Sequence, residues 1–265
     1  MKNRLSQKLK DSAQNKRKLF CAYLTLGYPS LQTTERMILA LEKAGTDIIE
    51  LGFPFSDPLA DGPTIQRASF EAIQKGMGLP NAFRLIKSLR KKGLKIPVLF
   101  FSYLNPIIHY GISRAIKHLN QSGFDGLIVP DLPPEEGKMW KNWFQKANLS
   151  MVYLAAPTTI PSRIKEIARE STGFIYYVSL RGVTGARAKL PADLIEKVKS
   201  IKKITAKPVL VGFGVSDSKQ AKMICQHADG IIVGSAIVNL LGRGKTGETQ
   251  ALALVSSLIR AMKQA

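Results

Sequence analysis

The chain has 265 residues, of which 45% are hydrophobic, so it can bury a full core and is not globally disordered. Its two cysteines lie far apart in apolar surroundings, which excludes a disulfide-rich secreted scaffold and predicts a reduced, cytoplasmic protein. The formal net charge of +20 is spread along the chain without a nucleic-acid motif, so we expect no nucleic-acid partner and a positive field that attracts an anionic substrate.

The N-terminal segment is basic, and an apolar stretch, residues 19–26, follows it. This stretch is shorter than the apolar core of a signal peptide, and no segment approaches the roughly 18 apolar residues that suggest a membrane helix. We therefore expect a protein without a membrane partner. The three histidines (His109, His118 and His227) are not spaced as metal ligands, so we also expect no metal site.

Eight apolar runs of strand length follow one another, at residues 19–26, 47–52, 96–101, 123–129, 150–155, 174–179, 208–213 and 229–233. Most do not alternate with polar residues, which is typical of parallel strands covered on both faces. Amphipathic stretches of helix length separate and follow them, at residues 33–44, 81–92, 112–121, 135–147, 161–170, 192–203, 217–225 and 249–262. The expected helix starts are Ser30, Asp217 and Thr246, and the expected stops are Gly45, Gly93 and Gly123.

Eight strands that each precede a helix, in a chain close to the roughly 250 residues typical of the fold, predict an α/β protein: a (β/α)8 TIM barrel that forms one domain over residues 1–265. The residues before Leu19 predict an extra N-terminal helix that closes the barrel floor. A doubly wound open sheet is the competing architecture. It usually has fewer strands and a glycine-rich turn after the first one, and Leu26-Gly27-Tyr28-Pro29 lacks that pattern.

Two acidic residues occur where such a barrel places its active site, at the C-terminal ends of the strands. Glu50 lies on the same face of the second predicted strand as Ile48, so it points into the barrel if Ile48 does. Asp61 follows in a proline-rich loop. A buried carboxylate is costly unless it is paired or used, and two carboxylates in different surroundings can differ in pKa, as general acid–base chemistry requires. We therefore expect residues 48–66 to be catalytic.

Glycines after the seventh and eighth predicted strands match the phosphate site that many barrels build there. Gly212 and Gly214 end one strand, and Gly234 and Ser235 follow the other. Their backbone N–H groups can approach a phosphate closely, and a short helix that begins at Gly234 or Ser235 would direct its positive end at the anion. Ordinary turn glycines are the alternative, but two such pairs at the right strands favour a phosphate site.

Three further features carry weaker signals. Residues 182–187 contain two glycines and are a candidate lid, although their composition alone favours a plain connection. Asp131 is expected to be structural or to lie at an interface. Aromatic side chains near the strand ends are expected to line an apolar pocket, and they are Tyr23, Phe101, Tyr103 and Tyr176.

The segment Glu50-Leu51-Gly52-Phe53-Pro54-Phe55-Ser56-Asp57-Pro58-Leu59-Ala60-Asp61-Gly62-Pro63-Thr64-Ile65-Gln66 resembles the signature of the tryptophan synthase alpha chain family. The resemblance continues at residues 25–29, 103–106, 129–133, 182–185, 212–215 and 234–238, so it covers essentially the whole chain. The (β/α)8 barrel of that family agrees with the strand count. One departure is Ser179-Leu180-Arg181, where many members carry arginine directly after the serine.

This resemblance implies a carbon–carbon lyase of tryptophan biosynthesis, which cleaves indole-3-glycerol phosphate to indole and D-glyceraldehyde 3-phosphate in a retro-aldol reaction. It implies that Glu50 is the general acid–base and that Asp61 bonds the indole N–H and stabilises the charge that develops on the ring. The positions that match the family's indole pocket are Tyr23, Phe101, Ile128, Tyr176 and Ile232; those of the lid are Thr184 and Gly185; those of the phosphate site are Gly185, Gly214, Gly234 and Ser235.

The resemblance also implies a partner protein. Family members pair with a beta chain, as an expected α2β2 heterotetramer, and that beta chain carries pyridoxal phosphate and receives indole through a tunnel. No cofactor is therefore expected in this chain itself. The positions that match the family's interface are Pro54, Asp57, Pro58, Asn105, Pro106, Asp131 and Pro133.

Two alternatives remain open from the residues alone. A barrel enzyme that acts on another phosphate ester would share the glycines but need not have Glu50 and the Asp61 loop. A catalytically weak or inactive barrel subunit that mainly activates the beta chain would keep the interface, and the presence of Glu50, Asp61 and Thr184 argues against it.

Overall fold

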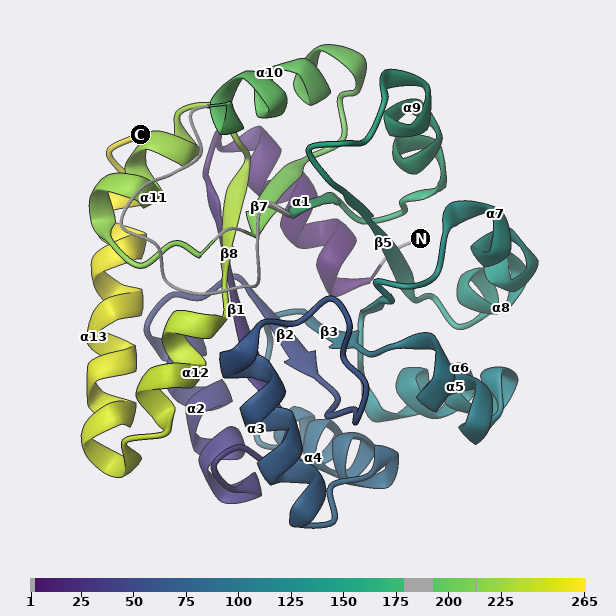
Figure 1. Cartoon of the computed structure of the whole chain (residues 1–265), viewed down its shortest axis with the longest axis vertical. Coiled ribbons are helices and arrows are strands. Elements are labelled where there is room, and N and C mark those ends of the chain that lie inside the picture. The colour runs from purple at the N-terminus through teal and green to yellow at the C-terminus, as the bar shows by residue number, and fades with distance from the viewer. Residues whose placement is uncertain (1–2, 179–192, 213) are drawn as a thin grey trace.

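The computed structural model of the chain describes residues 3–178, 193–212 and 214–265. In these residues eight parallel strands close into a barrel in sequence order, with the last strand paired to the first, and helices surround it (Figure 1). The predicted (β/α)8 barrel is confirmed. The strands are β1 (Leu19–Thr25), β2 (Ile48–Gly52), β3 (Val98–Phe101), β4 (Gly126–Ile128), β5 (Ser150–Ala155), β6 (Ile175–Val178), β7 (Val209–Gly212) and β8 (Gly230–Val233).

The helices keep the predicted alternation with the strands. Ser30 and Asp217 cap their helices with side-chain oxygens, as predicted, and Gly45, Gly93 and Gly123 have positive φ values where helices end. The helices of the described residues are α1 (Arg4–Gln14), α2 (Leu31–Lys43), α3 (Pro63–Gln74), α4 (Leu79–Lys91), α5 (Leu104–Tyr110), α6 (Ile112–Ser122), α7 (Pro134–Gly137), the 3-10 helix η1 (Lys138–Trp140), α8 (Lys141–Lys146), α9 (Pro161–Glu170), α10 (Leu194–Ile204), α11 (Ser218–Cys225), α12 (Ser235–Leu241) and α13 (Gly244–Met262).

Sequence analysis missed two helices and misplaced the start of a third. It gave no helix at α3, although Pro63 suits a first turn and the helix buries Ile65. It also gave none at α5, a short helix that follows β3. Thr246 is not a helix start, because Gly244, with φ of +68°, makes the turn out of α12 and α13 begins there. Residues 135–147 are helical but divide into α7, η1 and α8.

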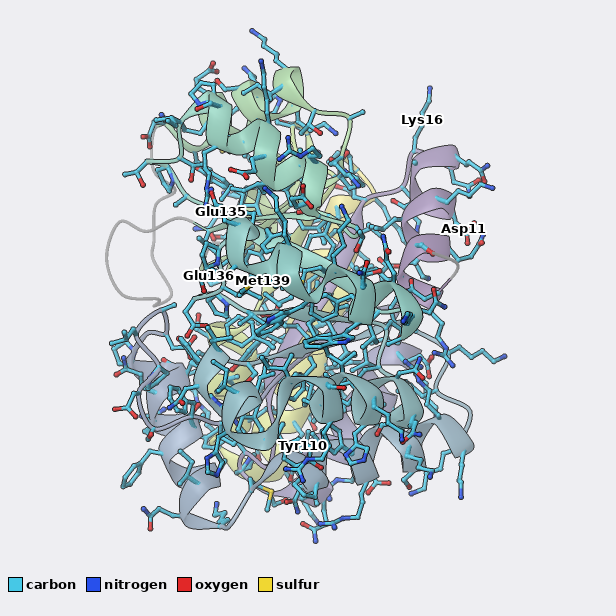
Figure 2. The ribbon with its side chains drawn as sticks, turned by 90° about the vertical axis from the view of Figure 1, so that its right-hand side faces the viewer. Asp11, Lys16, Tyr110, Glu135, Glu136 and Met139 are labelled. Carbon is cyan, nitrogen blue, oxygen red and sulfur yellow. The ribbon has the colours of Figure 1, made fainter. Side chains whose placement is uncertain are left out.

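The predicted extra helix lies at the N-terminal ends of the strands. Figure 2 shows α1, in purple, on the right-hand side of the molecule, with Asp11 and Lys16 labelled near it. Its Leu5 and Leu9 are buried in the core, and its Lys8 forms an ion pair of 3.5 Å with Asp47, which directly precedes β2. The N-terminal helix therefore covers the barrel floor and leaves the C-terminal ends of the strands free to form a site.

A repeated side-chain clamp joins the strands in pairs at this floor. In each pair, an Asp or Thr side chain shortly before an even-numbered strand accepts a hydrogen bond. The donor is a backbone N–H near the start of the odd-numbered strand that precedes it. These bonds run from Phe20 N to Asp47 Oδ2 (3.0 Å), Val98 N to Asp125 Oδ2 (2.9 Å), Met151 N to Thr172 Oγ1 (2.8 Å) and Val209 N to Asp229 Oδ2 (2.7 Å). Each bond satisfies a backbone donor that the barrel ladder leaves unpaired.

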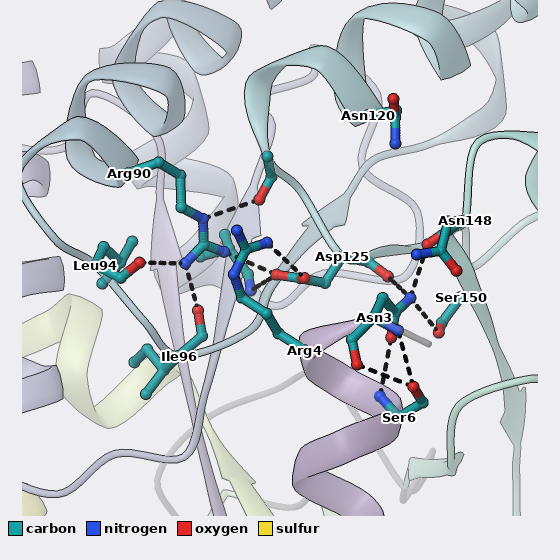
Figure 3. Close-up of polar contacts among 12 residues, drawn as sticks. Asn3, Arg4, Ser6, Arg90, Leu94, Ile96, Asn120, Asp125, Asn148 and Ser150 are labelled. Carbon is teal, nitrogen blue, oxygen red and sulfur yellow. Dashed lines mark hydrogen bonds and ion pairs between the residues drawn. The ribbon is translucent and has the colours of Figure 1, made fainter. Parts of the chain in front are cut away.

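Asp125 makes the most connected of these clamps (Figure 3). Its side chain is 1% exposed and also pairs with the guanidinium groups of Arg90 (2.7 Å) and Arg4 (3.1 Å). Burial lowers the pKa of Arg90 to about 10, and the Asp125 charge opposes this shift. A carboxylate that serves two arginines and a backbone N–H is expensive to remove, because the largely buried Arg90 side chain loses its counter-ion.

We expect Asp125→Asn to lower the free energy of unfolding by about 3 kcal/mol, because it keeps the side-chain volume but leaves the largely buried Arg90 guanidinium without its charge partner. Urea unfolding followed by circular dichroism measures the loss. Asp11→Asn on the exposed side of α1 is the matched control and leaves the unfolding midpoint unchanged. A midpoint of Asp125→Asn equal to that of the control would contradict the role given to this clamp.

Candidate active site

A cavity of about 510 Å³ lies at the C-terminal ends of the strands, and its volume is in the usual range for small-molecule sites. Both acids that the sequence singled out line it, together with most of the predicted pocket and phosphate positions. The lining residues are Tyr23, Glu50, Leu59, Ala60, Asp61, Ile65, Phe101, Pro130, Leu154, Ala155, Ala156, Thr159, Tyr176, Val178, Gly212, Gly214, Ile232, Gly234 and Ser235.

Glu50 sits inside the barrel wall on β2, where it pairs with Tyr23 of β1 and Leu99 of β3. It is 1% exposed, and its Oε2 atom has no hydrogen-bond partner among the described residues. Burial, and after it the charge of Asp61, raise the pKa of Glu50 well above its ordinary value. Glu50 therefore keeps its proton to a higher pH than an exposed glutamate and can act as a proton donor to a bound molecule.

Asp61 lies in the loop between β2 and α3 and is partly buried. Burial raises its pKa to about 7, while a hydrogen bond from the Tyr103 side chain acts in the opposite direction. The loop is fixed by a bond from Asp61 N to Pro58 O (3.0 Å) and one from Gln66 Nε2 to Asp61 O (2.8 Å). The two acids thus belong to different elements and differ in surroundings, as the sequence predicted.

Aromatic rings form much of the apolar wall. Tyr23 and Phe101 meet edge to face, with ring centroids 5.8 Å apart, and Tyr176 lines the cavity from β6. Two glycines leave room for these rings: a Cβ atom at Gly52 would lie 2.1 Å from the Tyr23 hydroxyl, and one at Gly212 would lie 2.3 Å from the Tyr176 ring. The cavity can therefore accept a flat apolar group beside Glu50.

Two predicted pocket residues, on β4 and β8, differ in whether they line the cavity. Ile232 of β8 lines the cavity, as predicted. Ile128 is fully buried on β4 opposite Phe101, but it is not among the lining residues. Pro130, two residues further along the chain, lines the cavity instead.

The predicted phosphate positions Gly214, Gly234 and Ser235 also line the cavity. Gly234 is the residue that precedes α12, and the N–H groups in the first turn of this helix have no intrahelical acceptor. An anionic group at this side of the cavity can therefore bond to backbone donors. The predicted lid residues Thr184 and Gly185 lie outside the described residues.

The predicted interface positions lie on the loops and helices that follow β2, β3 and β4. Asp57, Asn105 and Asp131 are exposed, Pro58, Pro106 and Pro133 are partly buried, and Pro54 is buried. The Asp131 carboxylate accepts a hydrogen bond from Leu104 N (2.9 Å), so it caps α5. Two apolar side chains are exposed close to these positions in the chain, Leu59 (95%) and Ile108 (52%).

Sequence reasoning missed the contribution of β5 and its following loop. Leu154, Ala155, Ala156 and Thr159 line the cavity, and none was proposed. The available signal was their position at the end of a predicted strand, because all eight strand ends meet at one rim. Tyr103, which was expected to line the pocket, is buried behind the Asp61 loop and is not among the lining residues.

Within residues 3–178, 193–212 and 214–265, no group of three or more His, Cys, Asp or Glu side chains is arranged to hold a metal ion. In the same part of the chain no helix has the length and apolar character needed to cross a bilayer.

Comparison with known proteins gives a consistent result. A family model described as tryptophan synthase alpha chain matches residues 9–265. The tryptophan synthase alpha chain of Dehalococcoides mccartyi is 45% identical over 252 residues, which cover 95% of this chain and 96% of the relative; that of Geotalea daltonii is 44% identical over 248 residues, covering 93% and 94%. A crystal structure of the alpha subunit from Legionella pneumophila has a TM-score of 0.92 and 33% identity, with 100% of both chains covered.

Proposed function

Since this chain belongs to the tryptophan synthase alpha chain family, we propose that Glu50 is the general acid–base of its reaction and that Asp61 stabilises the charge on the substrate ring. The family's activity is that of a carbon–carbon lyase in tryptophan biosynthesis. Indole-3-glycerol phosphate is cleaved in a retro-aldol reaction to indole and D-glyceraldehyde 3-phosphate.

The protonated side chain of Glu50 begins the reaction. It transfers its proton to C3 of the indole ring, which becomes an indoleninium cation. The Glu50 carboxylate then accepts the proton of the hydroxyl group on the carbon bonded to C3. That carbon becomes the aldehyde carbonyl, the bond to C3 breaks, and its electron pair returns to the ring. One proton leaves Glu50 and one returns, so a single buried residue completes the cycle.

Asp61 stabilises the cationic ring in this scheme. A carboxylate that accepts the indole N–H bond is a fixed negative charge beside the positive charge that appears after protonation of C3. The aromatic wall around Tyr23, Phe101 and Tyr176 suits the indole ring, and the glycines that follow β7 and β8 suit the phosphate. The proposed lid residues, Thr184 and Gly185, complete the assignment. They lie outside the described residues.

An alpha chain of this family needs no cofactor of its own, because pyridoxal phosphate belongs to the beta chain, which is its partner. We extend the proposal to an α2β2 heterotetramer in the cytoplasm. The exposed apolar side chains of Leu59 and Ile108 lie close in the chain to the predicted interface residues Pro58 and Pro106, which supports a protein partner that covers them at this rim.

The observation that carries the assignment is the burial of Glu50 beside Asp61 in one cavity. We expect the purified chain, incubated with indole-3-glycerol phosphate, to release indole and glyceraldehyde 3-phosphate in equal amounts, slowly alone and faster with the beta chain. Absorbance of indole and an enzymatic triose phosphate assay measure the two products. A chain that releases no indole but still stimulates the beta chain would contradict the assignment.

A further inference from the structure

We propose that Tyr103 is a positioning residue for this reaction, whose hydroxyl group holds the Asp61 loop and keeps the Asp61 carboxylate in the cavity. The inference rests on the role proposed for Asp61. It extends that role to a residue that does not touch the cavity, since Tyr103 is 3% exposed and is not among the lining residues.

The Tyr103 hydroxyl group engages two consecutive residues of the loop. Its oxygen accepts a hydrogen bond from Ala60 N (2.9 Å). The same group forms a side-chain hydrogen bond with Asp61 that lowers the pKa of Asp61. Because the oxygen already accepts from the Ala60 N–H, the phenolic proton is free to be donated to the Asp61 carboxylate. One hydroxyl group therefore fixes both the backbone before Asp61 and its side chain.

The Tyr103 ring is itself held on several sides. It packs against Phe55 with ring centroids 5.4 Å apart and meets Phe101 edge to face at 6.2 Å. Tyr103 directly precedes α5, whose first backbone N–H, at Leu104, is bonded by the Asp131 carboxylate (2.9 Å). A ring with these contacts has little rotamer freedom, so its hydroxyl group is a preorganised donor.

The hydroxyl group also keeps its proton across the working pH range. Burial and the charge of Asp61 raise the pKa of Tyr103 above its ordinary value. The other titratable side chains that face Asp61 in the described residues are Glu50 on β2, Tyr23 on β1 and Tyr176 on β6. None of these three side chains is hydrogen-bonded to the Asp61 carboxylate in the described residues, whereas Tyr103 is. Removal of the Tyr103 hydroxyl therefore raises the pKa of Asp61 further.

Tyr103→Phe tests the proposal, because it removes only the hydroxyl group. We expect kcat/KM for indole release to fall about tenfold, which is the size of effect for losing one hydrogen bond to a charged group. We also expect the acidic limb of the kcat/KM profile to move to higher pH, since Asp61 then becomes ionised at higher pH. In an Asp61→Asn background the same substitution should have little further effect on kcat/KM, because Tyr103 acts through Asp61.

Tyr110→Phe is the matched control. Its hydroxyl group bonds to His118 Nδ1 (2.8 Å), and neither side chain lines the cavity, so kcat/KM and the acidic limb should stay at the wild-type values. Thermal unfolding of both variants shows whether the fold is retained. An unchanged acidic limb in Tyr103→Phe, or an equal loss of kcat/KM in the Asp61→Asn background, would overturn the proposal.

A titration that does not need turnover separates this inference from the proposed function. Carbon-13 NMR of the aspartate side-chain carboxyl groups, assigned with Asp61→Asn, gives the pKa of Asp61 in the wild type and in Tyr103→Phe. A higher pKa in Tyr103→Phe supports the positioning role even if the wild type fails to cleave the substrate. An identical pKa in the two proteins refutes it even if the wild type is active.

Discussion

Glu50→Gln should reduce kcat for indole release by about 10³-fold, because glutamine fills the same space but cannot give a proton to ring C3 or take one from the substrate hydroxyl. Glu50 is buried and is the one acidic residue of β2, so no other acid on this strand replaces it. Single-turnover and steady-state assays of indole release measure the loss. Glu196→Gln on α10, whose side chain is 73% exposed, is the matched control and should keep the wild-type rate.

The stability of Glu50→Gln separates lost chemistry from lost fold. The pKa of Glu50 is raised in the folded chain, so the folded state favours the protonated form. This contribution to stability is fully present below the pKa of the unfolded glutamate and is lost as the pH rises through the raised folded value. Glutamine does not titrate, so Glu50→Gln should be more stable than the wild type by a margin that grows with pH. Wild-type activity in this variant would refute the proposed role of Glu50.

The barrel itself was predictable because its strands are covered on both faces. Buried parallel strands have nearly continuous apolar runs, and β1 to β3 are buried at every position. The alternation of side chains along β2 also predicts that Glu50 shares a face with Ile48 and points into the barrel if Ile48 does. The apolar runs and the alternation of side chains depend only on residues that are neighbours in the sequence, so both can be predicted from it.

The details of the rim depend on contacts between distant segments, and these were not predictable. Tyr103 and Ala60 are 43 positions apart, and their hydrogen bond exists only because β2 and β3 are neighbours in the barrel. The same applies to α5, a short helix whose cap comes from Asp131 in the next strand's loop. Ile128 was assigned to the pocket wall from the resemblance, but whether a strand residue reaches the cavity depends on the packing of its neighbours in the barrel.

Asp61→Asn should lower kcat/KM by about 10²-fold at neutral to basic pH, because the cationic ring loses a fixed negative charge at the moment it forms. The size of this effect should depend on pH. The pKa of Asp61 is raised to about 7, so the wild type loses the stabilising charge as the pH falls below that value. Asparagine is neutral throughout. The ratio of wild-type to variant kcat/KM should therefore shrink as the pH falls.

The same substitution should also alter the titration of Glu50, because the charge of Asp61 contributes to the raised pKa of Glu50. In Asp61→Asn that contribution is gone, so Glu50 loses its proton at lower pH and the basic limb of the kcat/KM profile moves to lower pH. Profiles of kcat/KM from mildly acidic to mildly basic pH measure both changes. In the proposed pair, Glu50 carries the proton and Asp61 carries the charge. A ratio of wild-type to variant kcat/KM that stays constant with pH, or a basic limb that does not move, would show that the two acids are not coupled in this way.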